Sequence, residues 1–105
     1  MANTKKVGEL KIDIKDDIAE GKYANLVLIA HTPVEFIIDF ATVLPLHEGA
    51  QVGSRIVMAP EHAKRFLLAL KDNIGQYEKQ NGEIIIHRSP QGNTVAPFGV
   101  PKGEA

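Results

Sequence analysis

Hydrophobic residues are most concentrated between residues 21 and 45, where the sequence reads GKYANLVLIAHTPVEFIIDFATVLP. The stretch from Tyr23 to Ala30 is hydrophobic at both odd and even positions, so an extended strand here is apolar on both faces. Proline fixes its own φ and donates no ladder hydrogen bond, and His31-Thr32-Pro33 therefore predicts a reversal. A second strand is predicted from Val34 to Val43. Together they form a β-hairpin.

Two further strands flank this hairpin. From Glu9 to Lys15, hydrophobic and charged residues alternate strictly, which is typical of a strand with one buried face. Residues from Gln51 to Ala59 predict a fourth strand, which begins after a loop rich in turn-forming residues. The expected sheet therefore has four antiparallel strands in the order strand, hairpin, strand.

One long helix is predicted from Pro60 to about Gln80. Proline is tolerated at the first helical position, and Asn81-Gly82 is a stop signal. The hydrophobic positions keep helical spacing: Ala63, Phe66, Leu67, Leu70, Ile74 and Tyr77. The fold class is α+β, with two layers in which the helix covers one face of the sheet.

The remaining segments define the domain boundaries. We expect a flexible N-terminus over residues 1–8, a single α+β domain over residues 9–88, and a disordered tail over residues 89–105, which is rich in proline and glycine. Ile84 to His87 are predicted to form either a short last strand or an arm that packs on a neighbouring molecule.

A helix on one face of the sheet leaves the other face without a cover. The face with Val34, Phe36, Ile38 and Phe40 is assigned to the core. The second face carries large hydrophobic side chains, which are Leu26, Leu28, Ile37 and Val57. A soluble monomer rarely exposes such a contiguous patch, so a homodimer or a higher homo-oligomer is predicted. The alternative is a monomer in which the strands curl and Ile84 to Ile86 fold back.

Composition narrows the function classes. The chain has 105 residues, no cysteine and a formal net charge of -1. Disulfides and thiolate chemistry are therefore excluded, and the chain lacks the strong basic excess of a non-specific nucleic-acid binder. The sequence shows neither a signal peptide nor a run long enough to span a bilayer, so we expect a cytoplasmic protein without a membrane partner.

The sequence offers little recognisable chemistry. The four histidines, His31, His47, His62 and His87, are not spaced as metal-ligand pairs. Ser54 lies in VGSRI, which is not a nucleophile elbow, and no glycine-rich phosphate loop occurs. We therefore expect no catalytic residue, no cofactor and no metal.

Two acidic residues on the second hairpin strand have a more structural interpretation. Glu35 and Asp39 are four residues apart, or about 13 Å along a strand, which is too far for a catalytic carboxylate pair. If the fourth strand lies beside them, Arg55 meets Glu35 or Asp39 as a cross-strand ion pair.

Four short motifs occur together in the chain: Gly-x-Tyr-Ala-Asn from Gly21, Glu-Phe-x-x-Asp-Phe from Glu35, Ser-Arg-Ile from Ser54, and Pro-x-His-Ala-Lys from Pro60. With them, residues 9–84 resemble a small prokaryotic family of about hundred-residue proteins that is classed as a domain of unknown function. More loosely, a four-stranded antiparallel sheet followed by a long helix is similar to the export chaperone SecB, which implies an oligomer that binds unfolded chains on apolar surfaces.

Three hypotheses for function follow. The first is a non-enzymatic, homo-oligomeric interaction domain, chaperone-like or an adaptor, with a protein client. The second is a nucleic-acid-associated protein whose dimer doubles a basic spot at Arg55, Lys64 and Arg65. The third is an enzyme in which His62 meets Glu35 or Asp39 and Arg55 across a subunit boundary. The candidate interface residues are Tyr23, Asn25, Leu26, Leu28, Glu35, Ile37, Asp39, Arg55, His62, Lys64 and Arg65.

Overall fold

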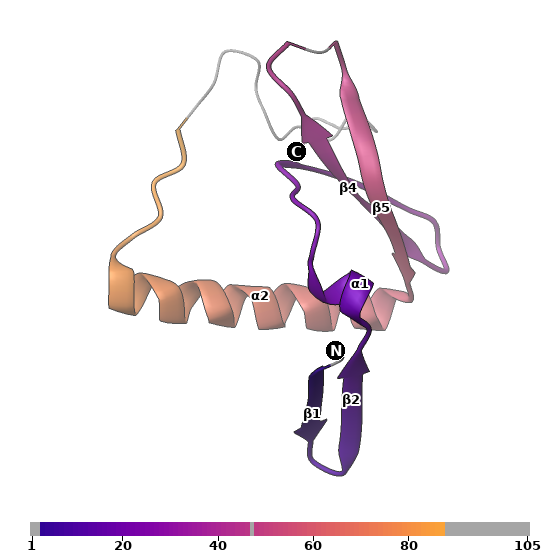
Figure 1. The fold of residues 1–105 in the computed structure, drawn as a ribbon, viewed down its shortest axis with the longest axis vertical. Coiled ribbons are helices and arrows are strands. Elements are labelled where there is room, and N and C mark those ends of the chain that lie inside the picture. The colour runs from indigo at the N-terminus through magenta and orange to yellow at the C-terminus, as the bar shows by residue number, and fades with distance from the viewer. Residues whose placement is uncertain (1–2, 47, 88–105) are drawn as a thin grey trace.

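The computed structural model describes residues 3–46 and 48–87, and it has the α+β composition that the sequence predicts (Figure 1). His47 and the predicted disordered tail lie outside the described residues. The elements in chain order are β1 (Asn3–Val7), β2 (Leu10–Ile14), α1 (Asp16–Ala19), β3 (Leu26–His31), β4 (Phe36–Val43), β5 (Ala50–Met58) and α2 (Pro60–Asn81).

The predicted hairpin is confirmed as β3 and β4, which pair antiparallel. The reversal is a tight turn in which the Thr32 N–H donates to the Glu35 carbonyl at 2.9 Å. The Thr32 hydroxyl also accepts the N–H groups of Val34 and Glu35, both at 3.2 Å. Directly before and after the turn, the rings of His31 and Phe36 stack with centroids 5.3 Å apart. Side-chain hydrogen bonding and ring stacking thus fix the register of this hairpin.

β5 completes a three-stranded antiparallel sheet in the order β3-β4-β5. The pairing of β4 with β5 changes register once, because Phe40 lies opposite Ser54 whereas Ala41 lies opposite Val52. Gly53 is the extra residue of this β-bulge. A side chain there would meet the Phe40 carbonyl oxygen at 3.8 Å, which is ordinary contact, so space alone does not require glycine.

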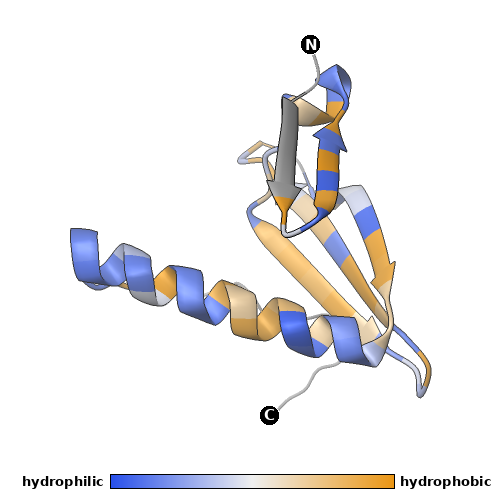
Figure 2. Cartoon of the chain, turned by 90° about the horizontal axis from the view of Figure 1, so that it is seen from below, coloured by the Kyte–Doolittle hydropathy of each residue, from blue (hydrophilic) through white to orange (hydrophobic). Residues whose placement is uncertain are grey.

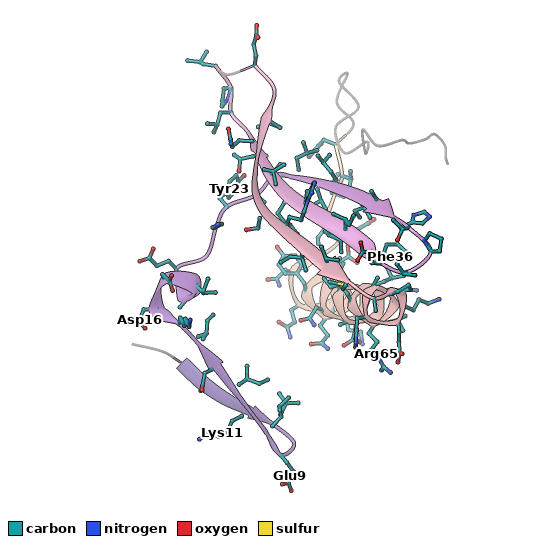
Figure 3. All side chains as sticks on the ribbon, turned by 90° about the vertical axis from the view of Figure 1, so that its right-hand side faces the viewer. Glu9, Lys11, Asp16, Tyr23, Phe36 and Arg65 are labelled. Carbon is teal, nitrogen blue, oxygen red and sulfur yellow. The ribbon has the colours of Figure 1, made fainter. Side chains whose placement is uncertain are left out.

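The N-terminal segment differs from the prediction. Residues Asn3–Val7, expected to be flexible, form β1 and pair with β2 in a separate two-stranded sheet. The predicted four-stranded sheet is therefore a three-stranded sheet with a separate hairpin, which projects away from it in Figures 1 and 3. The physical reason is local, since Gly8 has a φ of +61° and allows a tight turn that joins β2 to its immediate neighbour.

The long helix is confirmed over Pro60–Asn81, but its packing is not as predicted. Gly82, with a φ of +92°, ends the helix, and its N–H donates to the Glu78 carbonyl. No residue of α2 is buried. In Figure 3 the helix is seen end-on while the strands cross the view, so its axis is steep to the strands. Because only Ala59 separates β5 from α2, the helix leaves the sheet instead of folding back across it, and the two-layer prediction is wrong for the single chain.

The described residues bury very few side chains. The hydrophobic ones are Ile38 and Ala41, which are 4% and 1% exposed, and the charged residue Asp39 lies between them at 2%. All three lie on β4, the central strand. Ile38 is flanked across the sheet by Ile29 and Ile56. The core of the described chain is therefore a single strand with its nearest neighbours.

Truncation of this strand tests its importance. Ile38→Ala is expected to lower the free energy of unfolding by about 2–5 kcal/mol, because it leaves a cavity on the central strand. Val34→Ala is the matched control, since Val34 lies in the turn and is 74% exposed, and it should change stability by less than about 0.5 kcal/mol. Urea unfolding followed by circular dichroism measures both, and equal effects of the two substitutions would contradict a core at Ile38.

Candidate interaction surface

The polar centre of the sheet is an ion pair between β4 and β5. Asp39 and Arg55 are directly opposite in the register, as the sequence predicts for one of its two alternatives. The Arg55 guanidinium donates to both carboxylate oxygens of Asp39, from Nε at 2.7 Å and from a terminal nitrogen at 2.8 Å. The carboxylate side chain is 2% exposed, whereas the arginine side chain is 60% exposed. Such a bidentate pair fixes geometry as well as charge.

This arrangement shifts both pKa values. The hydrogen bonds from Arg55 hold the pKa of Asp39 below its ordinary value, against the opposite effect of desolvation, and its positive charge adds to the lowering. In return, the bond to Asp39 raises the pKa of Arg55. Both groups are therefore charged throughout the physiological range, so the pair is a structural clamp and not an acid-base couple.

The Gly-x-Tyr-Ala-Asn motif forms the connection that fastens the N-terminal part of the chain to the sheet. Asn25 extends the pairing of β3 with β4, because its side-chain amide donates to the Val43 carbonyl at 3.1 Å and its side-chain oxygen accepts the Val43 N–H at 2.8 Å. The Thr42 hydroxyl donates to the Tyr23 carbonyl at 3.0 Å. Lys22 Nζ donates to the Gly53 carbonyl on β5, also at 3.0 Å. The side chains of Lys22 and Asn25 thus bind main-chain groups of the sheet, whereas Tyr23 acts through its own main-chain carbonyl.

Tyr23 is the exposed side chain of this motif. It is 78% exposed on the linker between α1 and the sheet (Figure 3). It borders an open hollow of about 350 Å³, whose lining includes Ile18 from α1 together with Phe40 and Ile56 from the sheet. The hollow is largely hydrophobic and contains no cluster of charged side chains, so it offers contact area without evident chemistry.

The predicted basic spot is mostly neutralised. Arg55 is bound to Asp39, and Arg65 forms an ion pair with Glu61 one helical turn away. Lys64 has no ion pair within the described part of the chain. The Arg65 pair is exposed on both sides and stabilises the helix only weakly.

Within the described part of a single chain, the predicted catalytic constellation is formed only as far as the Asp39-Arg55 pair. His62 is exposed on the first turn of α2 and has no hydrogen bond to Asp39, Arg55 or Glu35 in the described region. Glu35 lies in the β3-β4 turn, where its main chain is used. Within residues 3–46 and 48–87, no group of three histidine, aspartate or glutamate side chains is placed to hold a metal ion.

The two faces of the sheet differ from the predicted core and surplus faces. We call the side that carries Ile38 the Ile38 face and the side that carries Asp39 the Asp39 face. On the Ile38 face, expected to be core, Val27, Ile29 and Ile56 are 39%, 47% and 44% exposed. On the Asp39 face, Leu26, Leu28 and Ile37 are half-buried, while Val57 is exposed. Both faces, and not only one, therefore retain accessible hydrophobic area.

The helix adds a third hydrophobic surface. Its stripe contains Phe66, Leu67, Leu70 and Ile74, which are 41%, 55%, 46% and 39% exposed. Figure 2 shows hydrophobic segments along the three-stranded sheet and in the middle of α2. Beyond the helix, Ile84, Ile85 and Ile86 are also exposed and form no strand. We call these surfaces together the apolar surface.

Comparison with known proteins agrees with the motifs. The family described as "Protein of unknown function (DUF3467)" matches residues 1–86. The chain belongs to the DUF3467 family. No curated protein and no solved structure matches it significantly, so the likeness to SecB gains no support. None of the helices that the structure describes in this DUF3467 chain combines the length and the hydrophobicity of a membrane-spanning segment.

The ion pair gives this DUF3467 domain a defined pH response. Because the pKa of Asp39 is lowered by folding, the unfolded state binds more protons near pH 4, and the stabilisation is present above the ordinary aspartate pKa of about 3.9 and lost as the pH falls. Asp39→Asn should flatten the dependence of Tm on pH between 6 and 3.

Removing Arg55 instead of Asp39 should reverse the direction in which stability changes with pH. In Arg55→Met, the hydrogen bonds and the positive charge are both lost, so burial alone acts on Asp39 and raises its pKa, and mild acidification should stabilise this variant relative to its own stability at pH 7. Thermal unfolding at a series of pH values measures all three proteins. Parallel curves for wild type and both variants would show that the pair is not coupled to folding.

The role of the motif is tested separately. Asn25→Ala removes two hydrogen bonds to Val43 and is expected to lower the free energy of unfolding by about 1–3 kcal/mol. Tyr23→Ala is the control, because its main-chain carbonyl still accepts from Thr42 and its ring is exposed, so stability should change by less than about 0.5 kcal/mol. Chemical denaturation measures both, and a larger loss for Tyr23→Ala would reverse this assignment.

Proposed function

We propose that the chain is a non-enzymatic protein-interaction domain, chaperone-like or an adaptor, that functions as a homo-oligomer. The observation that carries this proposal is the imbalance of hydrophobic burial. Among the described residues, only Ile38 and Ala41 are buried hydrophobic residues, whereas the exposed large hydrophobic side chains include those of both sheet faces and of α2. A folded chain with this surface needs a partner to remove it from water.

The helix supports the proposal independently. Helices in water gain most of their stability from the packing of an apolar stripe, and α2 buries no residue within its own chain. Each large side chain on this stripe gains about 1.5–3 kcal/mol on full burial. A second protein surface against Phe66, Leu67 and Leu70 therefore supplies the packing that the chain lacks.

The charges support interaction with protein over nucleic acid. Two of the three side chains of the basic spot, Arg55 and Arg65, are already bound to carboxylates. Release of counterions from phosphates requires cations that are available to neutralise them. The bidentate bond between Asp39 and Arg55 supports a structural over a catalytic role for these two residues.

The oligomeric state is the first test. One chain has a mass of 11.5 kDa, and a dimer of two such chains has 23 kDa. Sedimentation at micromolar concentration is expected to give 23 kDa or more. Leu70→Lys, on the helix stripe, should shift the population toward the monomer by at least tenfold in the dissociation constant, because a charge would be placed in the contact.

The control uses the same substitution away from the stripe. Leu46 is 98% exposed in the loop between β4 and β5, and Leu46→Lys should leave the oligomer intact. A single 11.5 kDa species for the wild-type protein would refute the proposal.

A binding experiment separates the protein-interaction domain from a nucleic-acid-binding protein. The wild-type protein is mixed with single-stranded RNA and with an unfolding test protein, each at low and at high salt. Binding to phosphates falls steeply with salt, whereas binding to an apolar client does not.

A further inference from the structure

The two edges of the three-stranded sheet are unequal. β3, at one edge, has the sequence LVLIAH, with no lysine, arginine, aspartate, glutamate or proline and no bulge in its pairing with β4. β5, at the other edge, contains Arg55 and the bulge at Gly53. In addition, the Gly53 carbonyl is occupied by Lys22 Nζ. One edge is thus regular and uncharged, and the other is interrupted.

Edge strands present main-chain N–H and C=O groups that can pair with another strand. Proteins prevent unwanted pairing with charged side chains, prolines and bulges, all of which bend or block the edge. β5 carries two of these devices, and β3 carries none. Along β3, every second residue presents its main-chain groups away from β4, and no described element pairs with them.

We propose that a second copy of the chain pairs antiparallel along β3, to give a six-stranded sheet in the order β5-β4-β3-β3-β4-β5. This inference rests on the homo-oligomer proposed above and adds a contact along β3 to the contact at the helix stripe that the Leu70 substitution tests. The six residues of β3 span about 20 Å at 3.3 Å per residue, which is enough for a ladder across a twofold axis.

The chemistry of β3 favours a second copy over an unrelated strand. Antiparallel self-pairing about a twofold axis places apolar residues opposite apolar residues on both faces at once. Val27 and Ile29 then meet their counterparts on the Ile38 face, and Leu26, Leu28 and Ala30 meet theirs on the Asp39 face. The strand contains no lysine, arginine, aspartate or glutamate that self-pairing would bring against a like charge. The exposed area of Val27 and Ile29 is reduced by the same contact.

The absence of cysteine makes the test direct, since each introduced cysteine carries a spin label at a unique position. Ile29→Cys and Ile56→Cys are a matched pair, because both residues flank Ile38 on the same face and are 47% and 44% exposed. Ile29 lies on the open edge and Ile56 on the interrupted one. Adjacent strands are about 5 Å apart, whereas the two β5 strands of the proposed sheet are five spacings, or about 24 Å, apart.

Dipolar spectroscopy on the two labelled proteins is expected to give strong short-range broadening at residue 29 and a resolved longer distance at residue 56. A dimer in which the labels at residue 29 are no closer than those at residue 56 overturns the edge pairing and leaves the homo-oligomer standing. A monomer at all concentrations overturns both proposals.

Hydrogen exchange on the unlabelled protein tests the same pairing without a spin label in the proposed contact. Amides of residues 26–31 should all be protected at high concentration, and those that point away from β4 should lose protection on dilution into the monomer. Amides of β5 should not respond to dilution in this way. Unchanged exchange across residues 26–31 while the dimer dissociates would overturn the proposal.

Discussion

The rest of the structure depends on the bidentate ion pair at the centre of β4. Asp39 is buried and charged, so it requires Arg55 directly opposite, and this requirement fixes the register of β5. A slip of one residue would place Arg55 on the other face and leave the carboxylate buried without its partner. The pair lies one residue before the register shift at Phe40 and Ala41, and the ladder resumes beyond the bulge, from Ala41 opposite Val52 to Val43 opposite Ala50. The ion pair therefore fixes the register of the part of β5 that follows the bulge.

The features that the sequence predicted well are those with a local cause. The β3-β4 reversal follows from Thr32 and Pro33, and the ends of α2 follow from Pro60 and Gly82. The Asp39-Arg55 contact followed from strand periodicity once β5 was placed beside β4. The strand β1 could not be predicted in this way, because residues 3–7 show no alternation of hydrophobic and polar positions and pair only through the turn at Gly8.

The candidate residues were harder to assign, for a related reason. Asn25 is an interface candidate among the motif residues that are predicted to hold register, cap the helix or line a partner groove, and its amide replaces a residue of the β3-β4 ladder. An asparagine immediately before a strand is a signal for such main-chain capping, since its side chain mimics a peptide group. The sequence also showed which positions of α2 are hydrophobic, but periodicity does not reveal whether the same chain covers them. Whether the chain covers its own helix stripe depends on the direction in which α2 leaves Ala59.

The dimensions of the elements explain why residues 3–46 and 48–87 do not complete a core within one chain. A 22-residue helix is about 33 Å long, whereas the outer strands of a three-stranded sheet are only about 10 Å apart. Even if α2 lay across the sheet, about half of its stripe would extend beyond the strands, and it would cover only one of two apolar faces. The proposed pairing through β3 would widen each face to about 24 Å, which matches the helix length more closely. That one contact would bring the area of the sheet and the length of the helix into proportion.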